Sequence, residues 1–320
     1  MFRKVKLKTL SIIFGALLIT TVGVRLMDNS TGINTLKPVL FDIDAEQVTS
    51  LIIQPRVLKG QNIELKKEGK QWRVLSEGHN YNGDAATIIN LISQINGLKP
   101  IRLAARDKSR WEKFELTDSL ASVVKLMGSN GELAQLYIGK FSYQMPKQQM
   151  PNQNPYMRQQ GTMTTYVRSG EDEEVFAVEG FLGSSVNRNA DAFRNKQVVK
   201  VNKDEINKLT FEYPADSSFT MVKNENVWMS DGIALDSASV ANYLSGISTL
   251  NAASFTNEVL QQPTHRVKIQ TNSAKTIEAH AKLEGNEAIM TSTQNQGSTF
   301  KERKNLVFEK LFTSKQNLQK

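Results

Sequence analysis

The sequence contains no cysteine and only three histidines among its 320 residues. Without cysteine, the chain can form neither disulfides, nor a thiolate nucleophile, nor a cysteine-ligated zinc site. His79, His265 and His280 are far apart and show no metal-ligand spacing. The phosphate-binding glycine loop and the Gly-x-Ser-x-Gly motif of many hydrolases are also absent. We therefore predict that the protein is not an enzyme and that it binds no metal and no cofactor.

Acidic residues occur in groups, and two carboxylates suffice for glycoside hydrolysis. Asp42 and Asp44 precede the first strand-like segment, and Asp172, Glu173 and Glu174 form a polar turn between two later ones. Both groups are typical of solvated linkers and turns. An envelope hydrolase that uses carboxylates distant in sequence is the alternative function.

Positive charge is concentrated at the N-terminus. Five of the basic residues behind the formal net charge of +8 lie in residues 1–27, which contain no acid. The remaining residues therefore carry a net charge of only +3. This is a weak electrostatic footprint, so we expect no nucleic-acid partner. A clustered basic face would instead indicate polyanion or lipid-headgroup binding.

Leu10–Val24 is an uncharged, largely apolar run that ends at Arg25. A membrane-spanning helix needs about 20 residues, so the run is short, although Leu26 and Met27 extend it. Thr21–Gly23 is a poor signal-peptidase site, which favours an uncleaved anchor over a cleaved signal peptide or a buried helix. The basic residues before the run predict a cytoplasmic N-terminus, with the rest of the chain on the extracytoplasmic side.

The rest of the chain contains one pattern twice. When Trp72 is aligned with Trp228, the strand-like segments before them match as well. Val48–Ile53 corresponds to Ile206–Phe211, and Ile63–Lys66 corresponds to Phe219–Val222. Apolar residues alternate around a polar turn before each tryptophan, as in a half-buried hairpin. The matched positions favour core packing of both indoles over a role in a ligand groove.

A helix-like segment follows each tryptophan, with Asp84 and Asp236 as the predicted N-caps. Apolar residues recur in both segments with helical spacing and at a constant offset of 152. The matched pairs are Ile88 and Val240, Leu91 and Tyr243, Ile92 and Leu244, Ile95 and Ile247, and Leu98 and Leu250. One face of each helix is therefore predicted to pack on a sheet.

Further strand-like segments follow each helix and are joined by short turns, which implies antiparallel pairing. We predict an α+β fold of two tandem copies of a mostly antiparallel sheet, each with one packed amphipathic helix, preceded by an N-terminal transmembrane helix. The expected organisation is a signal anchor at 1–27, a stalk linker at 28–43, a first module at 44–198 and a second module at 199–320.

Together, these segments resemble the bacterial family catalogued as domain of unknown function 4340 (DUF4340). The segments that carry the resemblance are the Trp72 strand, the Asp84–Leu98 helix, Phe114–Leu116, Leu136–Gly139, Thr165–Arg168, Val175–Val178, Ala192–Lys196 and the Trp228 strand. The resemblance covers residues 44–257, and this chain departs from the family pattern at 144–163.

The resemblance implies a duplicated module that an N-terminal helix anchors in the bacterial cell membrane, on the periplasmic side. It also implies partners in an integral-membrane complex, such as components of ABC-type export or gliding-motility-type transporters. The family assigns no catalytic residue, so none is carried over. The expected function is an extracytoplasmic binding or scaffold subunit that is accessory to such a complex.

Four residues are candidate contacts for that partner. Trp111 has no counterpart in the second copy and stands among basic residues, and the alternative is a local cap over the sheet. Arg188 and Arg194 lie in the junction between the copies. The alternative there makes Phe193 a plug between the units, with Asp191 and Arg194 paired around it.

Tyr156 is the fourth candidate and lies in a stretch rich in Gln, Met and Pro at 144–163. This stretch contains no acid and too little apolar surface to offset the entropy lost on ordering. We therefore expect a mobile insertion between two strands. Methionine side chains adapt to varied surfaces, which leaves a partner-binding loop as the alternative.

Deleting residues 145–161 should leave the melting temperature within about 3 °C of the wild-type value, because the stretch is not expected to contribute to the core. Thermal unfolding of the purified full-length protein measures this. A loss of about 10 °C or more would show that the stretch is part of the fold.

Overall fold

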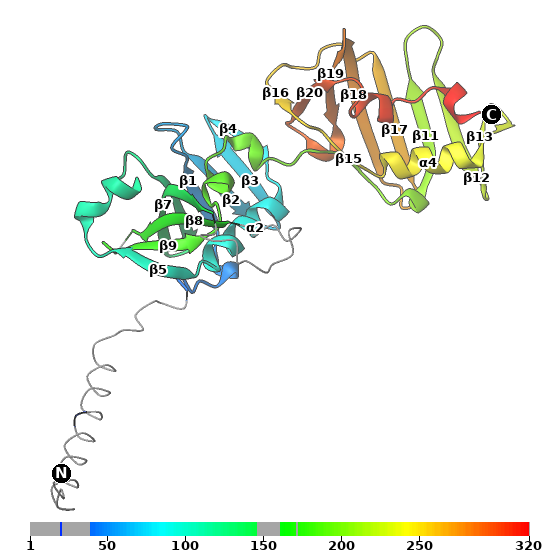
Figure 1. Ribbon diagram of the computed structural model, residues 1–320. Helices are drawn as coiled ribbons and strands as arrows, with labels where there is room; N and C mark the ends of the chain where they lie inside the picture. Colours follow the sequence, from blue (N-terminus) through cyan, green and yellow to red (C-terminus); the bar gives the residue numbers. More distant parts are fainter. Residues whose placement is uncertain (1–19, 21–38, 146–160, 171, 320) are drawn as a thin grey trace, which may run out of the picture.

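The computed structural model describes residue 20 and residues 39–145, 161–170 and 172–319 (Figure 1). Most of the expected anchor and stalk lies outside the described residues, and so does Tyr156. Within the described residues, no helix combines the length and the apolar character that a bilayer span requires.

Two nine-stranded antiparallel sheets make up most of the described chain. The first contains β1 (Ser50–Gln54), β2 (Ile63–Glu68), β3 (Gln71–Ser76), β4 (His79–Asn82), β5 (Pro100–Ala105), β6 (Ser122–Gly128), β7 (Gly131–Gln144), β8 (Thr162–Ser169) and β9 (Val175–Glu179). The second contains β11 (Ile206–Glu212), β12 (Phe219–Asn224), β13 (Val227–Ser230), β14 (Ile233–Ala234), β16 (Phe255–Thr256), β17 (His265–Thr271), β18 (Thr276–Glu284), β19 (Glu287–Ser292) and β20 (Thr299–Arg303).

Both sheets have the same strand order. The order is β4-β3-β2-β1-β6-β7-β8-β9-β5 in the first sheet and β14-β13-β12-β11-β17-β18-β19-β20-β16 in the second. The register also agrees, because Trp72 of β3 pairs with Lys67 and Trp228 of β13 pairs with Lys223. The predicted mostly antiparallel α+β fold with two repeated sheets is confirmed.

The edge strands were not predicted. Strands β4 and β14 are short, and their residues show no alternation of buried and exposed side chains. Strands β5 and β16 follow the helices and pair with the last strand of their sheet, β9 and β20. Their pairing depends on segments far away in sequence, so local periodicity gives no sign of it. In addition, β10 (Gln197–Lys200) and β15 (Thr249–Asn251) form a two-stranded sheet.

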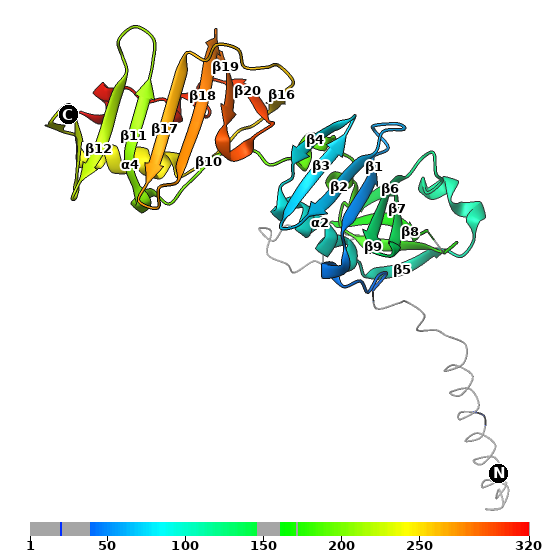
Figure 2. The ribbon, with the colours of Figure 1, turned by 180° about the vertical axis from the view of Figure 1, so that it is seen from behind.

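The core of each unit lies on the face of the sheet that its helix covers. Helix α2 (Ala85–Asn96) packs on the first sheet and α4 (Ser237–Ile247) on the second (Figures 1 and 2). The predicted helix positions are buried, except that Tyr243 is only partly buried. Trp72 and Trp228 belong to the two cores, as expected from their matched positions.

Both predicted N-caps are confirmed. Oδ1 of Asp84 accepts a hydrogen bond of 3.0 Å from the amide of Thr87, and Oδ2 of Asp236 accepts one of 2.9 Å from the amide of Ser239. Each cap thereby satisfies one of the amide groups that a helix start leaves without a partner.

The segment after the last strand closes each core. In the first unit this segment contains α3 (Gly183–Val186) and the turn Ala190–Ala192; in the second it contains α5 (Phe308–Leu311) and the turn Lys315–Leu318. The amide of Asp84 donates to the carbonyl oxygen of Phe193 at 2.8 Å, and the amide of Asp236 donates to that of Leu318 at 2.9 Å. The end of each unit is therefore fixed to the start of its helix.

The stretch at 144–163 is shorter at both ends than predicted. Strand β7 continues to Gln144, and β8 begins at Thr162, which pairs with Gln144. Met163 pairs with Tyr143 and is also a strand residue. These positions lack the apolar alternation that the prediction relied on. Residues 146–160 lie outside the described residues.

Replacing either cap by alanine, in Asp84→Ala or Asp236→Ala, should lower the free energy of unfolding by about 1 kcal/mol, because one amide at the helix start loses its acceptor. Asparagine keeps an acceptor at the same place, so Asp84→Asn and Asp236→Asn should lower the free energy of unfolding by only about 0.3 kcal/mol. Urea unfolding measured by circular dichroism gives the values. Equal losses for alanine and asparagine would mean that the carboxylates stabilise the units in another way.

Candidate functional site

The two units meet at a junction between the β4 edge of the first sheet and the β16 edge of the second (Figures 1 and 2). The connector, residues 187–196, runs through this junction from α3 to β10. It contains the polar cluster that the sequence marked as a candidate site.

Phe193 is buried in the core of the first unit. Phe193 therefore closes the first unit. The alternative interpretation of the connector, in which Phe193 is a plug between the two units, is wrong on this point. The residue that does lie between the two sheets is its neighbour, Arg194. The pairing of Asp191 with Arg194, which the same interpretation proposed, is present.

The guanidinium of Arg194 lies between two aromatic rings. Its Cζ atom is 3.6 Å from the ring centroid of Tyr81 in β4 and 3.6 Å from that of Phe255 in β16. Nη1 donates to Oδ1 of Asp191 at 2.8 Å, and Nη2 lies 3.4 Å from Oγ of Ser298. One arginine thus contacts both units and the connector at once.

Burial makes these contacts necessary, because a buried cation is costly unless it is paired. Arg194 is only 4% exposed, and its Nε atom has no hydrogen-bond partner within the described part of the chain. The ion pair with Asp191 and the two ring faces are therefore its main compensation. A planar guanidinium can stack on both rings, which a lysine ammonium cannot do.

Asparagine side chains form the rest of the junction. Nδ2 of Asn82 donates to Oδ1 of Asn295 at 3.2 Å and to the carbonyl oxygen of Gln296 at 3.3 Å. Asn295 is fully buried and donates in turn to the carbonyl oxygens of Asn195 and Gln197. These bonds fix the end of β4, the connector and the turn before β20 to one another.

A groove of about 270 Å³ opens beside Arg194, and we call it the junction groove. Side chains of both units and of the connector line it: Leu58, Gln61, Ser76, Glu77, Tyr81, Asn189, Ala190, Asp191, Arg194, Phe255, Thr256 and Asn257. The groove combines aromatic faces, amides and two carboxylates, and these groups can bind a polypeptide segment of a partner.

Trp111 is a cap on the outer face of the first sheet, as the alternative interpretation proposed. Its Nε1 atom donates to the carbonyl oxygen of Glu173 at 2.8 Å. The guanidinium of Arg168 lies between Trp111 and Tyr137, with Cζ 3.7 Å and 3.3 Å from the two ring centroids. Trp111 therefore covers a buried arginine, and its indole nitrogen is already engaged.

Of the other candidates, Arg188 is exposed and does not line the junction groove, and Tyr156 lies outside the described residues. Sequence reasoning missed Tyr81 and Phe255. The only available signal was an aromatic residue in each edge strand, and neither strand was predicted.

The three histidines occupy separate places. His79 is exposed on β4, and His280 lies on the outer face of the second sheet beside Glu278. His265 packs against Phe308 and Phe312, and burial lowers the pKa of its imidazole. Among the described residues, no group of three or more His, Cys, Asp or Glu is close enough together to hold a metal ion.

Residues 72–144 and 158–270 match the family described as domain of unknown function (DUF4340). The matched segments cover more than half of the chain and extend from β3 of the first unit to β17 of the second. The chain belongs to the DUF4340 family. No curated protein and no solved structure matches it significantly. In this DUF4340 protein, the match includes the whole connector and both rings that enclose Arg194.

Arg194→Ala should lower the free energy of unfolding by about 2 kcal/mol or more, since it removes two cation–π contacts and an ion pair. Arg194→Lys should lose most of the same stability, because an ammonium cannot stack between two rings. Chemical unfolding of the full-length protein measures both. The exposed Arg188→Ala is the matched control, expected within about 0.5 kcal/mol of wild type. If Arg194→Ala were as mild as the control, Arg194 would not hold the units together.

Proposed function

We propose that this DUF4340 protein is a non-enzymatic binding or scaffold subunit, anchored in the bacterial membrane by its N-terminal segment. Its two sheet units then stand on the extracytoplasmic side, where they contact an integral-membrane complex through the junction groove. Components of an ABC-type or gliding-motility-type transporter are the first candidates for that complex.

The observation that carries the proposal is the junction groove itself. Side chains from two units and a connector line this groove. Among them, Arg194 contacts Asp191, Tyr81 and Phe255 of the same chain. A groove lined by amides, aromatic faces and exposed polar groups supports recognition of a partner surface.

The sequence supplies the other two supports. The basic segment followed by Leu10–Val24 supports a location at the membrane, with the sheet units outside the cytoplasm. The likeness to the DUF4340 family supports a transporter-type partner.

Site-specific photocrosslinking in native membranes tests the proposal. A photoreactive amino acid replaces Gln61 or Asn257, which are exposed and line the junction groove from the two units. We expect both positions to crosslink to a protein with membrane-spanning segments, identified by mass spectrometry. Alkaline extraction of the same membranes reports separately whether the full-length chain is anchored.

Lys275 is the control position, because it is exposed on the turn between β17 and β18 and lies outside the groove. Crosslinks of equal strength at Lys275, or crosslinks to soluble proteins only, would contradict the proposal. Extraction of the protein by alkaline buffer would contradict the anchor without affecting the groove.

A second candidate function is an envelope hydrolase acting through carboxylates distant in sequence. The observation that favours this candidate is that Glu77 and Asp191 both line the junction groove. They are therefore the pair of acids to test first. Asp191, however, is engaged by Arg194 at 2.8 Å. Hydrolysis of purified peptidoglycan that is abolished in Glu77→Gln, with crosslinking unchanged, would favour the hydrolase.

A further inference from the structure

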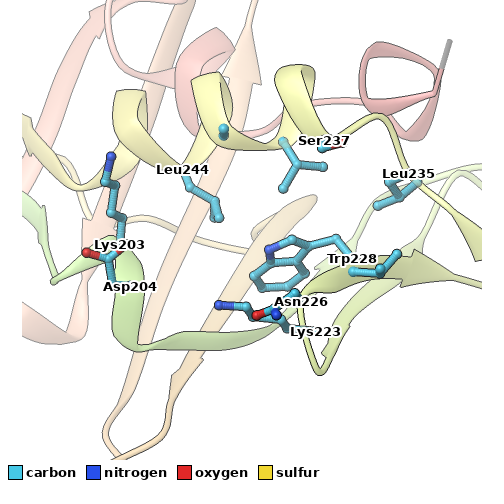
Figure 3. A pocket seen from close by; sticks show the side chains of 11 residues that line it. Lys203, Asp204, Lys223, Asn226, Trp228, Leu235, Ser237 and Leu244 are labelled. Atoms are coloured by element: carbon cyan, nitrogen blue, oxygen red, sulfur yellow. The ribbon is translucent and has the colours of Figure 1, made fainter.

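A second groove lies in the second unit, between α4 and the β12–β13 hairpin (Figure 3). Its volume is about 290 Å³. The indole of Trp228 forms one wall, and Leu235, Val240 and Leu244 add apolar surface. We call it the α4 groove.

The two copies differ in the size of one helix residue that lines the α4 groove. Ala241 lines it from α4, and the residue at the matching position of α2 is Ile89. The neighbouring core position differs in the same direction, with Val240 in place of Ile88. A longer side chain at position 241 would enter the space that forms the groove.

Two lysines line this apolar space. Lys203 precedes β11, and Lys223 lies in the hairpin strand β12 (Figure 3). Neither forms an ion pair with a carboxylate of the described residues, although Nζ of Lys203 lies 3.3 Å from Oγ of Ser245. Asp204 is the acid on the same rim. Both ammonium groups are therefore available to a negatively charged ligand.

The indole nitrogen of Trp228 is a further free donor. It forms no hydrogen bond within the described part of the chain, and it lies on the side of the ring that faces α4 (Figure 3). Trp111 differs, because its indole nitrogen is bonded to a carbonyl oxygen. A donor beside an apolar surface favours a ligand that presents a carbonyl oxygen next to an apolar group.

These features together specify the ligand. The apolar wall accepts a large side chain, the two lysines accept carboxylates, and Trp228 and Asp204 complement the carbonyl and amide groups of a backbone. The volume is at the small end for ligand sites, so it suits one side chain with its flanking backbone and not a long acyl chain. We propose that the α4 groove binds an extended acidic peptide segment through one large apolar residue flanked by carboxylates.

This site is separate from the junction groove, because the two share no lining residue. Its test is a binding titration, whereas the test of the proposed function is crosslinking in membranes. The two proposals can therefore fail independently.

The experiment measures the fluorescence anisotropy of a dye-labelled Ser-Asp-Phe-Asp-Ser peptide titrated with full-length protein in detergent. Comparison peptides carry Asn-Phe-Asn or Asp-Ala-Asp at the centre, and unlabelled decanoate serves as a competing carboxylate with an acyl chain. We expect saturable binding of the Asp-Phe-Asp peptide and about tenfold weaker binding of each comparison peptide.

Two variants locate the binding. Ala241→Ile introduces the residue of the first copy into the groove, and Lys223→Glu reverses the charge of one wall; each should weaken binding about tenfold. Ala238→Ile is the matched control on an exposed position of α4 outside the groove, and Lys275→Glu is the matched charge control. Both controls should stay within about twofold of wild type.

Four results would overturn the proposal, and three of them come from the direct titrations. They are the absence of saturation up to about 1 mM protein, equal binding of the acidic and amide peptides, and wild-type affinity in Ala241→Ile with its melting temperature unchanged. Competition by decanoate at lower concentration than the unlabelled peptide would assign the groove to an acyl carboxylate and overturn the peptide assignment.

Discussion

The fold depends on one constraint: the main core face of each sheet, on which the helix packs, has to be covered. A helix of 11 or 12 residues lies across a sheet of nine strands in the described chain, so it cannot cover the face alone. In each unit the segment after the last strand supplies the rest, and a backbone bond fixes it to the residue that caps the helix. The position of Arg194 follows from this closure. Phe193 is held in the first core by the amide of Asp84, so the next residue emerges at the β4 edge, where Tyr81 and Phe255 enclose it.

The outer faces of the two sheets show how the copies have diverged. In the first unit, residues 107–116 cover β7, β8 and β9, and the guanidinium of Arg168 lies between Trp111 and Tyr137. The second unit has a shorter segment at this place and a surface of ion pairs, such as Arg266 with Glu212 and Lys268 with Glu278. Exposed ion pairs contribute little stability. The second sheet is therefore stabilised mainly by apolar packing on its inner face. The first sheet buries apolar area on its inner face and also on part of its outer face.

Most of the repeat could be predicted from the sequence because its signals are local. Helical spacing, two aspartate caps and a tryptophan in a hairpin all arise within about thirty residues, where periodicity has physical meaning. The junction has no such signal. Arg194 was visible as a charged residue in the connector, but Tyr81 and Phe255 become its partners only through the two edge strands, and these show no alternation. The α4 groove was equally hidden, because it depends on the size of one exposed residue, Ala241, and not on a motif.

Duplication explains why both candidate sites lie where they do. A single unit needs its helix face and closing segment for stability, so neither can change freely to make a binding surface. A second unit relaxes this limit in two ways. The contact between the units creates the junction groove from edges that would otherwise face water, without altering either core. The second copy can also carry a smaller residue at position 241, since Ala241 and Ile89 are both exposed and neither belongs to a core cluster. The change that opens the α4 groove is therefore at an exposed position of the helix, and it leaves the cap, the tryptophan and the closing segment of the second unit intact.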